Sequence, residues 1–203
     1  MVDSLDYLEF PSSSPSPQGV VIFLHGWGAN APDLYPLAEV LNLPDYHFIF
    51  PNAPFPHPQV PGGLMWYDLN FPNPQQLEAS YQQLKGFLEG VSEATGVPLE
   101  KMVLAGFSQG GAMTLQVGFS LPLAGLICMS GYLHSEVKFS CQPPVFIFHG
   151  RFDPVVPLAK GKNACEELQN KGIAVTYEEF DMAHQIIPEE LERVRQVLLD
   201  LLG

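Results

Sequence analysis

The amino-acid sequence predicts a doubly wound α/β fold, in which a mostly parallel sheet of about seven strands carries helices on both faces. Two observations lead to this prediction. Short apolar runs alternate with longer segments of helical periodicity, and continuous apolar runs are typical of parallel strands that are buried on both faces. No long low-complexity segment interrupts the alternation, so we expect a single domain over residues 1–203.

The expected strands are short runs rich in apolar residues. They cover Leu5–Phe10, Val20–Leu24, His47–Phe50, Met102–Ala105, Gly125–Met129, Val145–His149 and Val175–Phe180.

Two longer segments have the apolar spacing of amphipathic helices. The first is Pro74–Thr95, where Asn73 followed by proline favours a helix start and the apolar stripe comprises Leu77, Tyr81, Leu84, Leu88 and Val91. The second is Pro188–Leu202, whose two glutamates near the start favour the positive end of the helix dipole. We expect both stripes to pack on the sheet.

Composition narrows the function classes. The chain has 9 basic and 22 acidic residues and a formal net charge of -13, so nucleic acid and anionic lipid surfaces are disfavoured as partners. No Lys or Arg precedes Lys85, so we expect no signal peptide. The apolar runs are far shorter than the ~20 residues that a spanning helix needs, and we expect no integral membrane association.

The cysteines indicate a reducing compartment. Cys128, Cys141 and Cys165 are odd in number, widely spaced and without a C-x-x-C pair. This spacing argues against a disulfide framework and against a zinc site. We therefore expect a cytoplasmic protein.

The segment Gly106–Gly110 fits the G-x-S-x-G pattern of a nucleophile elbow, with Ser108 at its centre. An apolar strand run precedes it and a plausible helix, Ala112–Val117, follows it, which is the structural context that the motif requires. Glycines on both sides let the backbone pass closely around a strained serine. An ordinary Gly/Ser turn is the alternative, and the strand and helix context favours the nucleophile.

Ligands of a doubly wound fold bind beyond the carboxyl ends of the strands, so we asked which reactive side chains directly follow a strand. Four segments do so: His25–Gly28, Ser108, Asp153 and His184. The chain order Ser, Asp, His is that of an α/β-hydrolase triad. A neutral imidazole is needed to take the serine proton, and a carboxylate fixes its tautomer and stabilises its charge. We assign these roles to His184 and Asp153.

Other histidines and acids are weaker candidates. His25 more plausibly braces its own loop, and His149 lies within a second His-Gly pair at a strand end. His47, His57 and His134 lack a matching position after a strand.

Among the acids, Asp181 competes with Asp153 but lies just three residues before His184, a spacing that rarely lets a carboxylate reach the far side of the ring. Asp33 and Asp68 are better explained as capping or loop carboxylates.

Acyl transfer needs backbone N–H groups aimed at the developing oxyanion. We assign one to Gln109, which follows the nucleophile, and the other to Trp27 in the loop after the first long apolar strand. The glycines of that loop also suit a phosphate-binding turn, but no P-loop lysine follows them.

These segments together resemble the serine carboxylesterases and acyl-protein thioesterases or lysophospholipases of the α/β-hydrolase superfamily. The resemblance rests on Val20–Gly28, the elbow, His149–Asp153 and Met182–Ile186, and it covers nearly the whole chain. It implies an α/β-hydrolase fold without a large lid domain and hydrolysis of esters or thioesters without metal or organic cofactor.

The same resemblance extends to Met65–Asp68, which is similar to a segment that borders the acyl pocket in that family, and it implies a substrate contact for Trp66. Two departures are visible. The amino-terminal part has room for one strand where the family commonly has a hairpin, and Trp27 replaces a leucine that is common there, which would narrow the acyl pocket.

We therefore expect a serine hydrolase that forms an acyl-enzyme on Ser108, with short-chain esters as the first substrate class to test and thioesters, lysophospholipids or acylated proteins as further ones. Leu69, Phe71 and the region of Phe55 either line an apolar acyl groove or pack under a long loop. An acyltransferase or peptidase with the same triad, or a silent binding protein, is the alternative. The sequence does not determine the oligomeric state.

Overall fold

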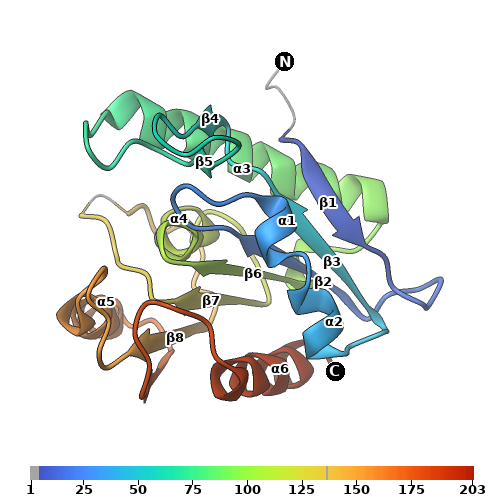
Figure 1. Ribbon diagram of the computed structural model, residues 1–203. Helices are drawn as coiled ribbons and strands as arrows, with labels where there is room; N and C mark the ends of the chain where they lie inside the picture. Colours follow the sequence, from blue (N-terminus) through green and yellow to red (C-terminus); the bar gives the residue numbers. More distant parts are fainter. Residues whose placement is uncertain (1–4, 136) are drawn as a thin grey trace.

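The computed structural model describes residues 5–135 and 137–203 and contains one seven-stranded sheet (Figure 1). The strand order is β1-β3-β2-β6-β7-β8-β9. All neighbouring strands are parallel except β1, which pairs antiparallel with β3. The strands are β1 (Tyr7–Phe10), β2 (Gly19–Leu24), β3 (Tyr46–Pro51), β6 (Met102–Phe107), β7 (Gly125–Met129), β8 (Val145–Gly150) and β9 (Val175–Phe180).

Six α-helices and a small separate hairpin complete the described structure. The hairpin pairs β4 (Phe55–Pro56) with β5 (Leu64–Met65), and a 3₁₀ turn, η1 (Leu99–Lys101), precedes β6. The helices are α1 (Ala31–Leu34), α2 (Leu37–Leu41), α3 (Pro74–Thr95), α4 (Gln109–Gly118), α5 (Leu158–Asn170) and α6 (Pro188–Leu202).

Two apolar cores lie on opposite faces of the sheet. Side chains of α3, α4 and α5 pack in one core, and side chains of α1, α2 and α6 pack in the other (Figure 1). Strand β2 contributes side chains to both cores, because its neighbouring residues Ile22 and Phe23 are each 0% exposed and belong to different cores. Burial on both faces explains why the central strands are continuous apolar runs.

The predicted architecture is confirmed. All seven strands and both long helices lie where the sequence predicts them, with strand ends that differ by at most two residues. The short helices α1 and α2 and the β4–β5 hairpin were not expected. Each of these helices and each strand of the hairpin contains five residues or fewer, too few for a periodic apolar pattern to be recognised.

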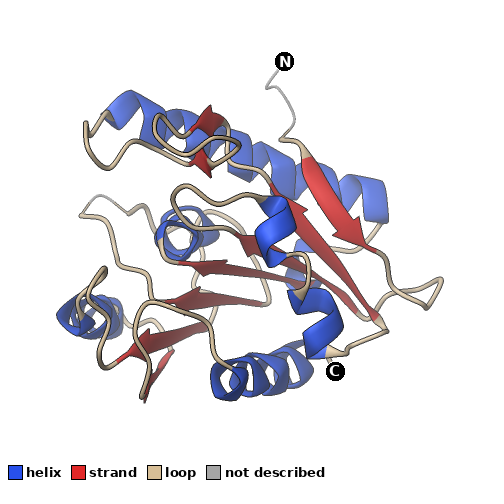
Figure 2. Cartoon of the chain, in the orientation of Figure 1, coloured by secondary structure: helices blue, strands red, loops and turns tan. Residues whose placement is uncertain are grey.

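The parallel strands end at a common edge of the sheet. Registers pair Leu24 with Gly106 and Phe107 with Met129, and the last residue of β8 pairs with the last residue of β9. The arrowheads of β6 and β7 point to this side (Figure 2), where Ser108 alone joins β6 to α4 and a longer segment follows β7. This edge is where a doubly wound sheet binds its ligands.

Strand β9 is the outer edge on the side away from β1, and it carries two adjacent acidic residues. Glu178 accepts from Arg193 Nε at 2.9 Å. Glu179 lies 3.2 Å from Arg151 Nε and 3.0 Å from Lys162 Nζ. Both sides of this edge strand therefore carry ion pairs.

None of the helices in the described part of the chain combines the length and the apolar character that crossing a membrane requires.

Candidate active site

The serine of the G-x-S-x-G motif occupies a strained turn between β6 and α4. Ser108 has φ 57° and ψ -119°. Non-glycine residues rarely adopt this combination, and backbone strain of this kind is found mainly at functional sites. Its N–H donates to Met129 O at 2.8 Å, and its carbonyl accepts the Ala112 N–H at 3.0 Å. The turn is thus fixed to the neighbouring strand on one side and to the helix on the other.

The two glycines of the motif are required by close approach of the backbone. A Cβ on Gly106 would lie 2.3 Å from Gly110 O, and a Cβ on Gly110 would lie 2.1 Å from Leu24 O. Both contacts are to backbone, which cannot move aside as a flexible side chain can. The sequence pattern therefore has a packing cause in addition to its motif context.

Ser108, His184 and Asp153 lie in one hydrogen-bonded row. His184 Nε2 is 2.9 Å from Ser108 Oγ, and His184 Nδ1 is 2.7 Å from Asp153 Oδ2. The ring of Phe107 packs against the imidazole with a centroid separation of 4.8 Å. A carboxylate on Nδ1 holds the proton there and leaves the Nε2 lone pair facing the hydroxyl, which is the arrangement that a general base for serine needs.

The carboxylate of Asp153 is buried and held on both oxygens. Its Oδ1 accepts the N–H groups of Val155 and Val156, each at 2.8 Å. Burial by itself would raise the pKa of Asp153, but the bonds from His184 and from these two amides outweigh it and lower the pKa. The group is therefore an anion that can stabilise an imidazolium.

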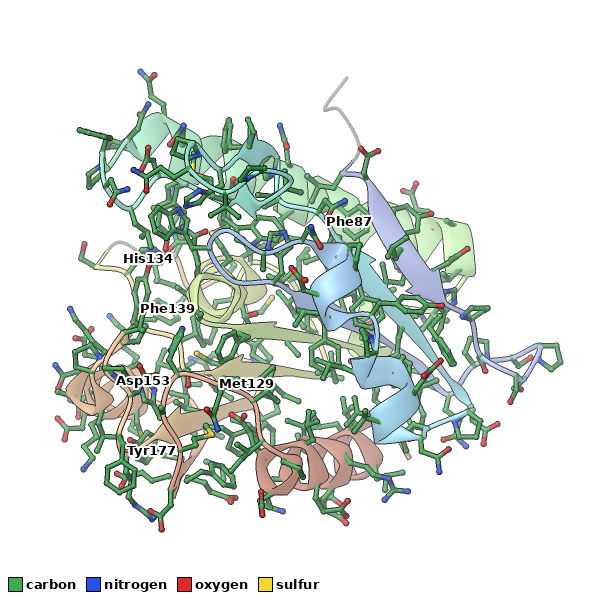
Figure 3. All side chains as sticks on the ribbon, viewed as in Figure 1. Phe87, Met129, His134, Phe139, Asp153 and Tyr177 are labelled. Carbon is green, nitrogen blue, oxygen red and sulfur yellow. The ribbon has the colours of Figure 1, made fainter. Side chains whose placement is uncertain are left out.

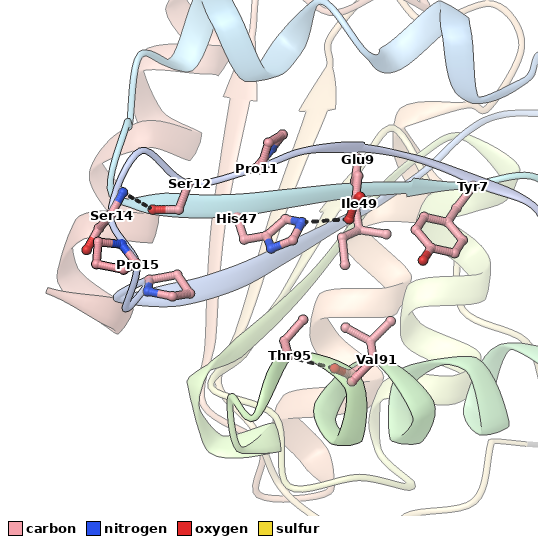
Figure 4. Close-up of a pocket in the computed structure, with 12 residues that line it drawn as sticks. Tyr7, Glu9, Pro11, Ser12, Ser14, Pro15, His47, Ile49, Val91 and Thr95 are labelled. Atoms are coloured by element: carbon pink, nitrogen blue, oxygen red, sulfur yellow. Dashed lines mark hydrogen bonds and ion pairs between the residues drawn. The ribbon is translucent and has the colours of Figure 1, made fainter.

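The competing residues lie elsewhere. Asp181 binds Arg151 Nη1 at 2.5 Å on an exposed surface. His47 Nε2 pairs with Glu9 Oε2 at 3.2 Å in a separate pocket of about 360 Å³ between the amino-terminal segment and the end of α3 (Figure 4). Asp33 accepts the Asn30 N–H as part of a capping box at α1, which agrees with the expectation of a capping role.

The loop after β2 passes beside the nucleophile. A Cβ on Gly26 would lie 3.3 Å from Ser108 Cβ, so this loop brings the next amide, that of Trp27, to the same region. Gln109 is the first residue of α4, and first-turn amides have no partner within their own helix. Gln109 therefore follows Ser108 directly in the chain, and the loop that carries Trp27 passes close to Ser108 in space.

His25 braces this loop, as the sequence suggests. Its Nδ1–H donates to Gly26 O at 2.8 Å, and its Nε2 accepts the Ala53 N–H at 3.0 Å. Burial lowers the pKa of His25 more than the bond to Gly26 raises it. The ring is accordingly a neutral structural element.

Trp66, the residue for which a substrate contact is expected, is buried in the structure. Its side chain is 0% exposed, and its indole N–H donates to His25 O at 3.0 Å. The backbone N–H of Trp66 donates to Gln109 Oε1 at 3.0 Å, and Gln109 Nε2 donates to Tyr67 O at 2.7 Å. Trp66 therefore lies beneath the loop that carries Trp27 and supports it. The sequence did not predict that the Gln109 side chain joins this segment to the elbow.

A polar cluster beyond this segment was also missed. Tyr67 Oη is 2.5 Å from Tyr132 Oη and 2.9 Å from His134 Nε2. Burial lowers the pKa of His134 to about 4, so its ring is neutral at pH 7. The side chains of Tyr67 and His134, together with Leu77, contribute to a pocket of about 370 Å³, and His134 lies on the side of the molecule where Asp153 lies (Figure 3).

Two apolar side chains are exposed on the loop between β5 and α3. Phe71 is 80% exposed and Leu69 is 42% exposed. They do not pack under a long loop, which was one of the two alternatives for them.

Comparison with known proteins identifies the family. Residues 5–201 match the model of the phospholipase/carboxylesterase family. Acyl-protein thioesterase 1 of Saccharomyces cerevisiae is 29% identical over 85% of this chain and 88% of its own, and acyl-protein thioesterase 1 of Gibberella zeae is 30% identical over 94% and 93%. The crystal structure of esterase PE8 superposes with a TM-score of 0.92 at 29% identity, over 98% of this chain and 100% of that one.

These relatives do not favour the acyltransferase, peptidase or silent-protein alternatives. The chain therefore belongs to the phospholipase/carboxylesterase family, and it is a serine hydrolase of the α/β-hydrolase fold that cleaves carboxylic esters.

Proposed function

We propose that Ser108 is the nucleophile of this hydrolase, His184 its general base and Asp153 the carboxylate that orients the base. The observation that carries the proposal is the unbroken row of contacts, 2.9 Å from Ser108 Oγ to His184 Nε2 and 2.7 Å from His184 Nδ1 to Asp153 Oδ2. The row begins at Ser108, whose backbone is strained.

The reaction follows from these positions. Ser108 Oγ attacks the carbonyl carbon while His184 Nε2 takes the hydroxyl proton, and the imidazolium is stabilised by Asp153. The same proton is delivered to the departing alcohol or thiol, which leaves an acyl-enzyme. Water then gives up a proton to His184, attacks the acyl carbon, and releases the carboxylic acid and the free serine.

The amides of Trp27 and Gln109 are the proposed oxyanion donors. The closeness of Gly26 to Ser108 and the position of Gln109 in the first turn of α4 support this assignment. The positive end of the helix dipole adds to the stabilisation of a negative oxygen at this place.

Short-chain esters are the proposed substrates to test first. The bulky Trp27 in the loop after β2 supports this choice, because a large ring there would leave less room for a long acyl chain; the ring packs against His57 at a centroid separation of 4.3 Å. Acyl thioesters, on proteins or small molecules, and lysophospholipids are the second class. The names of the thioesterase relatives and of lysophospholipase-like protein 1 of Mus musculus, which is 29% identical, support this extension.

We also propose a cytoplasmic location. Cys128, Cys141 and Cys165 are free thiols in the structure, and burial raises the pKa of Cys128 to about 12. Unpaired cysteines of this kind are typical of a reducing compartment.

Labelling with a fluorophosphonate tests the nucleophile. We expect one adduct per chain, located by peptide mass spectrometry on Ser108, together with loss of esterase activity. S108A should take up no label, whereas S130A, which removes the hydroxyl at the end of the next strand, should be labelled as wild type is. A folded wild-type protein that remains unlabelled while it hydrolyses esters would overturn the assignment.

A further inference from the structure

His149 lies at the end of β8, four residues before Asp153, and the proposed reaction does not use it. Its side chain is 0% exposed. Its Nε2 is 2.8 Å from Val156 O. A carbonyl oxygen accepts, so Nε2 carries the proton and donates it to this carbonyl.

Val156 is consequently bound at both of its backbone groups. Its carbonyl accepts from His149, and its N–H donates to Asp153 Oδ1 at 2.8 Å. Pro157 follows and restricts Val156 to extended backbone. The residue that holds one oxygen of the carboxylate is thus itself held by the imidazole of His149.

The imidazole of His149 has little freedom to move. A Cβ on Gly161 of α5 would lie 2.6 Å from His149 Nδ1 and 3.0 Å from its Cγ, so the helix backbone packs directly against one side of the ring. Nε2 is also 3.8 Å from Asp153 Oδ2, too far for a hydrogen bond. The ring therefore acts on Asp153 through Val156.

We propose that His149 is a positioning residue for the reaction: its N–H fixes Val156, and Val156 fixes Asp153 in line with His184. This inference rests on the triad of the proposed function. It assigns a role to a side chain that the sequence pattern alone did not distinguish from an ordinary strand-end histidine.

The expected consequence is kinetic. A carboxylate that turns away from His184 Nδ1 stabilises the imidazolium less, and a misplacement of about 1 Å in a catalytic group can cost about 10²-fold in rate. The side chain of Asp153 is 0% exposed, so it does not reach the substrate. A loss of this kind should therefore appear in kcat with little change in KM.

Two substitutions at His149 test the hydrogen bond. H149L removes the donor, and we expect kcat for p-nitrophenyl acetate to fall by about 10- to 100-fold, with the acid limb of the kcat/KM profile displaced to lower pH. H149Q offers an amide N–H where Nε2 lies, and it should recover most of the lost activity and the wild-type pH profile. A purely structural role would lower the folded fraction without displacing the limb.

A glycine in α5 provides an independent test that leaves His149 unchanged. G161A should displace the buried ring, lower kcat and move the acid limb in the same direction as H149L. G90A is the matched control, because Gly90 lies inside α3 and a Cβ there meets nothing within 4 Å. Ala is the better helix former at both sites, so G90A should retain wild-type kinetics.

The possible outcomes separate the two proposals. Failure of the wild-type enzyme to label at Ser108 counts against the triad itself. The role of His149 would be overturned if wild type is labelled and hydrolyses esters while H149L keeps the wild-type kcat and pH profile. An H149Q variant that is as impaired as H149L would also overturn it, because the hydrogen bond would then not be the cause.

Discussion

Two serines directly follow adjacent strands of the sheet, and both have a positive φ. Ser108 follows β6 with φ 57°, and Ser130 follows β7 with φ 48°. Each donates its N–H to a carbonyl near the end of the neighbouring strand, Ser108 to Met129 O in β7 and Ser130 to Phe148 O in β8, both at 2.8 Å.

The hydroxyls of these serines have different surroundings. Ser108 Oγ contacts His184 Nε2, and α4 begins at the next residue. Ser130 Oγ is buried and has no hydrogen-bond partner within residues 5–135 and 137–203, and no helix follows it directly. A strained strand end is therefore insufficient for a nucleophile, which also needs a base within reach and a helix that begins at the turn.

The largest expected effect separates these two serines. S108A should lower kcat by on the order of 10⁶-fold, because loss of a triad serine removes the covalent route. S130A should retain activity within about twofold, since that hydroxyl makes no bond to lose. Steady-state hydrolysis of p-nitrophenyl acetate by the purified variants measures both. A large loss in S130A would show that the β7 turn takes part in the reaction.

The next effect concerns the acid. D153N should lower kcat by about 10⁴-fold, because an amide in this place favours the wrong tautomer of His184. D181N breaks an exposed pair with Arg151, and exposed pairs contribute little, so its kcat should be unchanged. Equal losses in the two variants would contradict the assignment of Asp153.

A smaller effect is expected at Trp66. W66F removes the N–H that binds His25 O, a bond worth about 1 kcal/mol, so kcat should fall about fivefold as the loop that carries Trp27 loosens. The ratio of activities on acetate, butyrate and octanoate esters should stay at its wild-type value. A change in this ratio would indicate that Trp66 touches the acyl group.

The smallest effect on activity is expected at a second buried polar group that, like Ser130, lacks a partner. Glu190 is 0% exposed, and neither carboxyl oxygen has a partner in the described part of the chain. Burial raises its pKa to about 8. In the unfolded chain this carboxyl loses its proton above about pH 4.3, whereas in the folded protein it keeps the proton up to about pH 8. The free energy of unfolding therefore falls as the pH rises from about 4.3 to about 8.

E190Q tests this dependence because it stays neutral at every pH. Its Tm should exceed that of wild type at pH 8 and match it at pH 4, with kcat unchanged. Thermal unfolding at pH 4, 6 and 8 gives the comparison. A difference in Tm of the same size at all three values would mean that protonation of Glu190 is not its source.

The fold was predictable from sequence because burial on both faces imposes continuous apolar runs, and the meeting of Ser108, His184 and Asp153 was predictable because each follows a strand. Interactions across the sheet edge were not predictable in the same way. The indole N–H of Trp66 donates to a carbonyl 41 residues away in the sequence. The side chain of Gln109 bonds the backbone of Trp66 and Tyr67, which lie 43 and 42 residues away. A sequence does not display such pairings, so it gave no sign that Trp66 supports a loop.

The histidines illustrate the same limit. A position after a strand identified His184 correctly as a neighbour of Ser108. The same criterion gave no means to recognise His149, which bonds the backbone carbonyl of Val156. The criterion also missed His134, which contacts the Tyr67 hydroxyl from another loop.

The ion pairs along β9 have a consequence for assembly. An outer strand exposes unpaired N–H and C=O groups that can template the addition of a strand from another molecule. Glu178 and Glu179 are tied to Arg193, Arg151 and Lys162 beside this edge. A second strand would have to approach a row of charges and strip them of water, so β9 is protected against edge-to-edge aggregation.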